Sequence, residues 1–304
     1  MPFISLDFGP PQEAITKERI QEMLTWTPRR FRLMEIDQPL KPPGAFGDDW
    51  NLFFPFKETF VPAFELASSI NHISFKSTGK SGCYTFLKDV TEEEIGELQE
   101  WLSDIAPHVA IRDCLLVSFA LDYDREDGNP LKSRTKIGCL RTRAKPYDSQ
   151  PTSDTYVAAD ELIAECLRFV TKVRCYDAVD AVVAVPPSKP DKEFDLPRHL
   201  TRGIANGLGK DDLSDSVRTV KARASVKNRV LSEKLSALED TIHVDPEAFK
   251  GKMVMVVDDL YQSGVSINYL GMLLLQAGAR KVLGLACEKT CRNDDNVGGA
   301  DSGD

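Results

Sequence analysis

Residues 254–266, with the sequence VMVVDDLYQSGVS, contain four apolar residues, two adjacent acids and a short loop of hydroxyls around a glycine. Three of the four apolar residues are β-branched, and a continuous run of this kind predicts a strand buried on both faces. Behind the loop, apolar residues recur at helical spacing at positions 267, 270, 274 and 277, and Gly278 stands where a helix would end. The stretch therefore predicts a strand, an acidic pair, a loop and a helix, in that order.

The loop has the chemistry of an anion site. The first turn of a helix presents free backbone N–H groups and a positive dipole end, which suit a phosphate. Ser263 and Ser266 add hydroxyl donors, and Gly264 lets the backbone approach a ligand closely. Asp258 and Asp259 repel a phosphate, so they must serve hydroxyls or a cation nearby. A sugar phosphate meets both demands, and the alternative is an ordinary buried strand followed by a polar turn.

This pattern resembles the phosphoribosyl pyrophosphate signature of the type I phosphoribosyltransferases, in which an apolar strand runs into two acids and a Thr/Ser–Gly–x–Thr/Ser loop. Gln262 departs from it, because many members carry a second Thr there. The resemblance covers about residues 115–290. It is strongest to stand-alone bacterial phosphoribosyltransferases related to the amidophosphoribosyltransferase and competence-associated groups, through LPRHL at 196–200 and AGARKV at 277–282. There is no N-terminal cysteine to act as a glutaminase nucleophile, so ammonia release from glutamine is not expected.

The rest of the chain from residue 108 to 290 predicts an α/β fold. Strands and helices alternate from about 156 to 286, which predicts a parallel sheet with right-handed crossovers. Strands are expected at 114–123, 178–185, 216–220 and 282–286, and helices at 156–173 and 196–208. The segment 135–142 is expected to return as a strand after a turn at 124–130. It ends in a basic cluster, which is either a solvated face or a contact for phosphates or an acceptor: Arg141, Arg143 and Lys145.

Two loops carry further candidate residues by resemblance. The loop 186–192 follows a predicted buried strand, at the sheet edge where ligands of open α/β sheets bind. In phosphoribosyltransferases this loop contacts the leaving pyrophosphate, which implicates Ser188, Lys189 and Lys192 here. Residues 221–234 are basic and poor in large apolar residues, and the family carries a mobile, charged loop at this place. Each loop also has a plain interpretation as solvated chain with incidental charges.

The remaining segments set the predicted domain organisation. Residues 1–107 form a region of unknown role, with helices expected near 20–26 and 91–102 and an aromatic patch at 53–64 that we interpret as core. Residues 108–290 form the phosphoribosyltransferase-like domain, and 291–304 form a disordered acidic tail. The expected fold is thus a type I phosphoribosyltransferase-like parallel sheet flanked by helices, with an additional N-terminal α+β region.

Composition narrows the function classes. The net charge of −9 argues against a general nucleic-acid binder. No apolar run approaches the length of a membrane span, and the N-terminus lacks the basic region of a signal peptide. The seven cysteines are dispersed and contain no Cys-x-x-Cys pair, so reduced thiols in a cytoplasmic protein are expected rather than a zinc ribbon.

The resemblance implies binding of phosphoribosyl pyrophosphate and displacement of pyrophosphate by an unidentified nitrogen acceptor, with Mg²⁺ held through the ligand. The alternative is a non-catalytic sensor of phosphoribosyl pyrophosphate or a nucleotide that acts with a protein partner. A homodimer or a partner bound through the N-terminal region is a further option. The predicted catalytic residues are Asp258, Asp259, Lys189 and Lys227, and the predicted substrate-binding residues are Leu260, Tyr261, Gln262, Ser263, Gly264, Val265, Ser266, Ser188, Lys221 and Arg223.

Overall fold

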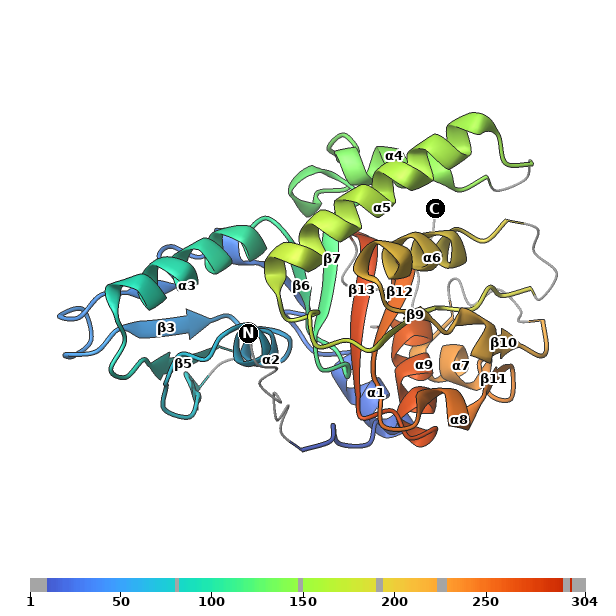
Figure 1. Cartoon of the computed structure of the whole chain (residues 1–304). Coiled ribbons are helices and arrows are strands. Elements are labelled where there is room, and N and C mark those ends of the chain that lie inside the picture. The colour runs from blue at the N-terminus through green and yellow to red at the C-terminus, as the bar shows by residue number, and fades with distance from the viewer. Residues whose placement is uncertain are drawn as a thin grey trace.

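The computed structural model describes residues 10–79, 82–146, 150–189, 194–222, 229–291 and 296. Its centre is a seven-stranded sheet (Figure 1). Neighbouring strands run parallel from β7 to β9, whereas β1 and β6 pair antiparallel at one edge. The predicted α/β fold with a largely parallel sheet is confirmed. In spatial order the strands are β1 (Arg30–Arg32), β6 (Val109–Ile111), β7 (Ser118–Tyr123), β13 (Lys281–Lys289), β12 (Met253–Tyr261), β8 (Ala181–Ala184) and β9 (Asp211–Asp212).

The strand β12 lies at the centre of this sheet, between β13 and β8. Val254 pairs with Ala181 and Val257 with Ala184, in parallel register. All four residues of the apolar run are buried, and they alternate between two cores because successive strand side chains point to opposite faces. The prediction that the runs at 254–257 and 182–185 form neighbouring central parallel strands is confirmed.

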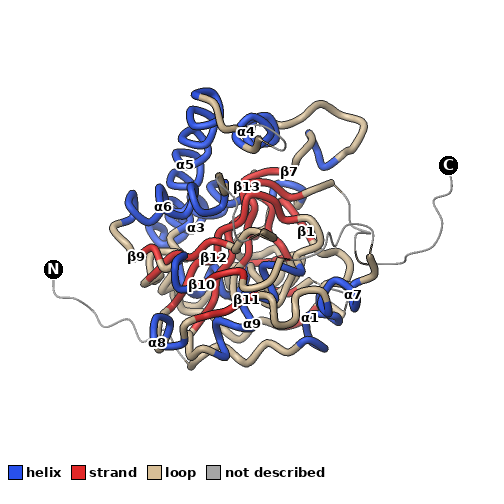
Figure 2. Tube along the Cα trace, turned by 90° about the vertical axis from the view of Figure 1, so that its right-hand side faces the viewer, coloured by secondary structure: helices blue, strands red, loops and turns tan. Residues whose placement is uncertain are grey.

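Helices cover both faces of the sheet, as Figure 2 shows. One face carries α4 (Lys136–Ala144), α5 (Ser153–Val173) and α6 (Leu196–Leu208). The other carries α1 (Lys17–Met23), α7 (Leu231–Ser236), α8 (Pro246–Phe249) and α9 (Val265–Gln276). A small antiparallel pair, β10 (Val217–Thr219) and β11 (Ile242–Val244), lies beside α7 and α9. Short 3-10 helices cover Leu33–Glu35, Glu126–Gly128 and Ser214–Ser216.

Local signals explain where the predicted helices begin and end. The Asp195 side chain accepts a hydrogen bond from the Arg198 amide at the start of α6, and Pro197 occupies its first turn. The helix ends at Gly209, whose φ of 64° is the left-handed conformation that glycine adopts without strain. The bounds predicted for this helix are those observed. Thr152 caps α5 with a capping box completed by Thr155, and the helix begins at Ser153, three residues before the start expected from the sequence.

The N-terminal region adds a second, antiparallel sheet, seen at the left of Figure 1. Four of the five phenylalanines of its aromatic patch are core as expected, since Phe54, Phe56, Phe60 and Phe64 are at most 1% exposed, whereas Phe53 is partly exposed. These side chains belong to the same core as α5 and α6. The sheet order is β2 (Leu40–Lys41), β3 (Asn51–Phe54), β5 (Cys83–Phe86), β4 (Lys76–Ser77), with helices α2 (Phe60–Ala67) and α3 (Glu92–Ile105) packed on it.

The N-terminal region and the main sheet are joined across the predicted boundary at residue 107. The strand β1 pairs with β6, and Phe31 lies opposite Ala110. The Trp101 indole N–H donates to the Val173 carbonyl of α5 at 2.9 Å. The division of the chain at 107 therefore stays a prediction, while the observed core runs through it.

Two predictions of local structure are wrong. Residues 135–142 form the start of α4, not a returning strand. The reason is a helical pattern that the alternation of residue types conceals: Ile137, Leu140, Arg141 and Ala144 are buried at helical spacing, and the Thr135 side chain caps the first turn. The last four residues of the loop expected at 221–234 belong to α7, which buries Leu231 and Leu235. Residues 223–228 and most of the tail at 291–304 lie outside the described residues.

All seven cysteines are free thiols. Among the described residues, no helix is both long and apolar enough to cross a membrane.

Candidate functional site

The candidate site lies where β8 ends beside Val257 of β12, which itself runs on to Tyr261. The Val185 amide donates to the Val257 carbonyl at 2.9 Å, so the loop that follows β8 starts next to Asp258. Carboxyl ends of adjacent parallel strands form the edge at which open α/β sheets bind ligands. The structure thus brings together two segments that are about 70 positions apart in the sequence, the acidic pair and the loop containing Ser188 and Lys189.

The two acids of the pair have different surroundings. Asp259 is buried, and its carboxylate binds two cationic side chains. One belongs to α4 and the other to the residue that directly follows this helix. Arg141 Nε lies 2.9 Å from Asp259 Oδ2, and Lys145 Nζ lies 2.7 and 3.0 Å from the two carboxylate oxygens. Asp258 is only partly buried, and one of its oxygens accepts from the Asp259 amide at 2.8 Å. Asp258 is therefore the acid that is open to a ligand.

A third carboxylate joins this cluster from the neighbouring strand. Arg141 Nη1 lies 3.1 Å from Glu288 Oε1, so one buried guanidinium bridges β12 and β13. Burial raises the pKa of Glu288 to about 7, although Arg141 opposes the shift. Burial also disfavours the charged form of Asp259, but Lys145 and Arg141 prevail and hold its pKa below the ordinary value.

The environment of Asp258 favours its neutral form. Burial, followed by the negative charge of Asp259, raises the pKa of Asp258 to about 8. The acidic pair thus carries about one negative charge near neutral pH instead of two. Lys145 and Arg141 balance that charge, so a phosphate-bearing ligand meets much less repulsion here than the two adjacent acids suggest.

The loop after β12 is held in a bent conformation by glycine. Gly264 has a φ of 81° and begins α9 without a side-chain cap. A Cβ at this position would lie 2.2 Å from the Tyr261 hydroxyl oxygen, so only glycine fits. Tyr261 and Val265 are buried, whereas Leu260, Gln262, Ser263 and Ser266 are partly exposed. Among the predicted loop residues, Tyr261 and Val265 therefore reach a ligand only through their backbone.

Two buried cations bind the carbonyl oxygens of this loop. Lys289 Nζ donates to the Gln262 carbonyl at 3.2 Å, and Arg29 Nη1 donates to the Ser263 carbonyl at 2.8 Å. Both side chains are at most 1% exposed. Within the described part of the chain, Arg29 Nη2 has no hydrogen-bond partner. Fixed positive charge beside a loop of backbone amides raises the local potential for an anion.

The loop after β8 leaves its two candidate residues exposed. Ser188 and Lys189 are both solvent-accessible. The Thr219 hydroxyl donates to the Pro187 carbonyl at 2.5 Å, which ties the end of β10 to this loop. Lys221, two residues further on, is exposed as well. The remaining predicted residues of this part of the site, Lys192, Arg223 and Lys227, lie outside the described residues.

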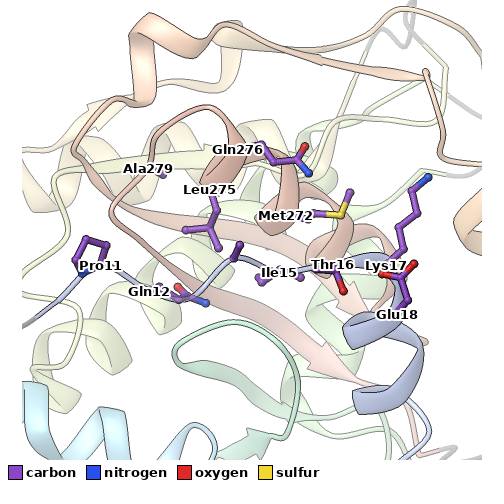
Figure 3. Close-up of a pocket in the computed structure, with 11 residues that line it drawn as sticks. Pro11, Gln12, Ile15, Thr16, Lys17, Glu18, Met272, Leu275, Gln276 and Ala279 are labelled. Carbon is purple, nitrogen blue, oxygen red and sulfur yellow. The ribbon is translucent and has the colours of Figure 1, made fainter.

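A separate hollow of about 490 Å³ lies between the N-terminal segment and α9 (Figure 3). Its walls include Ile15, Thr16, Met272 and Leu275. These α9 residues belong to the C-terminal half of the helix, whereas the loop at Gly264 begins its N-terminal end. The hollow is therefore distinct from the candidate site.

One acid of the candidate site, Asp258, is open to contact with a metal ion that a ligand brings with it. Within the described residues, no group of three or more His, Cys, Asp or Glu side chains is placed to hold a metal ion. Mg²⁺ is commonly bound through one or two carboxylates together with substrate phosphates. Asp258 supplies one partly exposed carboxylate at this edge, while Asp259 is already bound by Arg141 and Lys145.

Sequence reasoning missed the residues that support the site from within. Arg29 and Lys289 lie 27 or more positions from the loop carbonyls that they bind and belong to no motif. Asn268 is a third such residue: it is buried in α9, and its side-chain amide donates to the Gly264 carbonyl at 2.8 Å. The sequence marks Arg141 and Lys145 only as members of a basic cluster, and the predicted strand hides their helical spacing of four.

No family model and no curated protein matches this chain. Solved structures similar to it include the glutamine phosphoribosylpyrophosphate amidotransferase of B. subtilis complexed with ADP and GMP, at 14% identity and a TM-score of 0.34, covering 71% of this chain and 43% of that one. An adenine phosphoribosyltransferase matches at 15% identity and a TM-score of 0.31, covering 51% and 98%. The allosteric regulatory enzyme of purine biosynthesis matches at 13% identity and a TM-score of 0.29, covering 72% and 43%.

This chain spans less than half the length of the first of these structures. At TM-scores this low, the likeness does not decide the family of the chain.

Proposed function

We propose that this chain binds phosphoribosyl pyrophosphate and transfers its phosphoribosyl group to a nitrogen acceptor. The observation that carries the proposal is the convergence of three features at one sheet edge. Asp258 is a partly exposed acid, the Gly264 loop opens α9 without a side-chain cap, and Ser188 and Lys189 are exposed on the adjacent loop. A ribose with a phosphate at one end and a pyrophosphate at the other needs these three kinds of contact.

In the proposed reaction the acceptor nitrogen attacks the anomeric carbon of the ribose. The bond from that carbon to the pyrophosphate oxygen breaks, and its electron pair leaves with the pyrophosphate. The proton of the acceptor nitrogen passes to solvent. Mg²⁺ bound to the pyrophosphate would neutralise part of its negative charge. The protein has to hold the two ends of the substrate and stabilise positive charge on the ribose.

The two acids have separate parts in this proposal. Asp258 binds the ribose hydroxyls, and once it has lost its proton its carboxylate faces the ring as the ring gains positive charge. Asp259 holds Arg141 and Lys145 beside the site, which keeps the cluster near neutrality. Residues 260–266 bind the 5′-phosphate through backbone amides and the hydroxyls of Ser263 and Ser266. Ser188, Lys189 and Lys221 bind the departing pyrophosphate.

Calorimetric titration with phosphoribosyl pyrophosphate and magnesium tests the binding step. We expect wild type to bind and Asp258→Asn to lose most of the affinity. Asp215→Asn serves as the matched control, because the Asp215 side chain is 96% exposed on the short helix before β10. Absence of binding by wild type would reject the proposal.

A second experiment separates transfer from sensing. The protein is incubated with labelled phosphoribosyl pyrophosphate, magnesium and a panel of nucleobases and amines, and pyrophosphate release is followed. Acceptor-dependent release supports the transferase. Tight binding without release for every acceptor would favour the sensor of phosphoribosyl pyrophosphate that the sequence leaves open.

A further inference from the structure

A buried polar network lies under the loop that we assign to the 5′-phosphate. Its centre is Asp113, a residue in the segment before β7 that is 2% exposed. It accepts hydrogen bonds from the Tyr261 hydroxyl at 2.9 Å, the Leu115 amide at 2.9 Å and the Asn268 amide nitrogen at 3.2 Å. The Ser118 hydroxyl lies 2.9 and 3.0 Å from its two oxygens. All four donors are neutral groups.

Two members of this network also hold the loop itself. Asn268 Nδ2 donates to the Gly264 carbonyl at 2.8 Å, and it lies 3.2 Å from the Tyr261 hydroxyl. The Tyr261 hydroxyl fills the space that a Cβ on Gly264 would need. Asn268 is anchored in turn by the Cys114 amide, which donates to its Oδ1 at 2.9 Å. The turn at Gly264 therefore rests on one tyrosine and one asparagine, and both are bound to Asp113.

The remaining side-chain donor, Ser118, belongs to β7 and, among the residues that the structure describes, makes no hydrogen bond to the loop. It is 1% exposed on β7, and its amide donates to the Thr59 hydroxyl, away from the loop. Ser118 and Tyr261 thus offer the same chemistry to Asp113, one neutral hydroxyl each, but only Tyr261 touches Gly264. A buried network in which every polar group has its hydrogen-bond partners holds its side chains in one arrangement.

We propose that Asp113 is a positioning residue for the phosphate loop: through Tyr261 and Asn268 it fixes Gly264 and the first turn of α9 in the conformation that binds a sugar 5′-phosphate. The inference rests on the proposed function, because that function supplies the ligand of the loop. Burial raises the pKa of Asp113 to about 6, which agrees with a carboxylate retained in an enclosed site. Asp113 does not contact the ligand and acts only through its two partners.

Tyr261→Phe and Ser118→Ala form a matched pair for the test, since each removes one buried hydroxyl from the same carboxylate. The probes are ribose 5-phosphate, which engages the Gly264 loop, and inorganic pyrophosphate, which engages the loop at Ser188. We expect Tyr261→Phe to weaken ribose 5-phosphate binding by about tenfold and to leave pyrophosphate binding unchanged. Ser118→Ala should leave both affinities at the wild-type value. Asn268→Ala serves as a second variant with the same expected selectivity as Tyr261→Phe.

Amide hydrogen exchange of residues 262–266 in the ligand-free protein gives a readout that is independent of the proposed function. Tyr261→Phe and Asn268→Ala should accelerate exchange in this segment, and Ser118→Ala should not. Equal exchange in all three variants, or a loss of ribose 5-phosphate binding that Ser118→Ala shares, overturns the positioning role. If wild type binds no ribose 5-phosphate while exchange still differs between the variants, the positioning role stands and the proposed function falls.

Discussion

Arg141 Nε donates to Asp259 Oδ2 across 2.9 Å, and the same guanidinium reaches Glu288 at 3.1 Å. The Arg141 and Asp259 side chains are 7% and 4% exposed. Because of this contact, the two acids of the pair have different roles. One acid is part of the protein's internal structure and secures α4 against the end of β12, and the other remains for a ligand.

Removal of Arg141 should therefore cost far more than removal of an exposed arginine on the same helix. Arg141→Ala leaves Asp259 and Glu288 buried with less compensation, and we expect a loss of about 3–5 kcal/mol in the free energy of unfolding. Arg143→Ala is the control, because the Arg143–Asp154 pair is 44% and 60% exposed. Its expected loss is at most about 1 kcal/mol. Urea unfolding of both variants gives the comparison, and equal losses would show that the buried contact does not secure α4.

Substitution of the two acids one at a time should show that Asp258 serves ligand binding and that Asp259 serves the stability of the fold. We expect Asp258→Asn to fold with at least wild-type stability and to lose ligand recognition. Asp259→Asn should be destabilised, because it leaves Arg141 and Lys145 with a neutral partner. In thermal unfolding with magnesium, phosphoribosyl pyrophosphate at a hundred times its dissociation constant stabilises a binding-competent protein by about 2.7 kcal/mol. An equal ligand-induced gain in Asp258→Asn and wild type would exclude Asp258 from ribose recognition.

The raised pKa of Asp258 predicts a specific dependence of stability on pH. The folded pKa of about 8 lies above the ordinary value of 3.8, so the folded protein binds a proton that the unfolded chain releases between these values. The contribution of this group is fully present at low pH and is lost as the pH rises from about 4 to about 8. Asp113, with a folded pKa of about 6, acts in the same direction over the lower part of this window.

The variant Asp258→Asn isolates the upper part of that window. Between pH 6 and pH 8, wild type should lose stability relative to the variant, with a limiting slope of about 1.4 kcal/mol per pH unit. Parallel urea titrations at several pH values measure the difference. A difference that stays constant with pH would mean that Asp258 is ionised throughout this range in the folded protein.

Gly264 should tolerate alanine less well than a glycine of similar backbone conformation in open space. Gly209 has a φ of 64° and no atom within 4 Å of the place that a Cβ would occupy, whereas Gly264 has a φ of 81° and its Cβ would meet the Tyr261 hydroxyl at 2.2 Å. Gly209→Ala should cost about 1–2 kcal/mol through its left-handed backbone alone. Gly264→Ala should cost more and should weaken ribose 5-phosphate binding as well. Equal costs in denaturant unfolding would indicate that Tyr261 moves aside freely.

The sequence by itself determined the elements whose signals are local. The apolar runs at 254–257 and 182–185 predicted buried central strands, because a strand covered on both faces needs no polar positions. Asp195, Pro197 and Gly209 lie at the ends of α6, and Gly264 lies at the turn into α9. The sequence also placed Asp258 directly after the apolar run of a central strand, but β12 continues through both acids to Tyr261, past the strand end that the sequence predicts.

Only the tertiary structure decided how the acidic pair is divided and what supports the loop. Arg141 is 118 positions from Asp259, and Asp113 is 148 positions from Tyr261. No sequence spacing encodes such contacts, because they arise when separate elements pack on the same sheet edge. The predicted strand at 135–142 is wrong because of such distant contacts. The residues that α4 buries are defined by its packing on β7 and β13, which the local sequence does not show. Helix propensity summed over the nine residues of α4 is too weak to determine a helix. The packing that stabilises the helix comes from residues distant in the sequence.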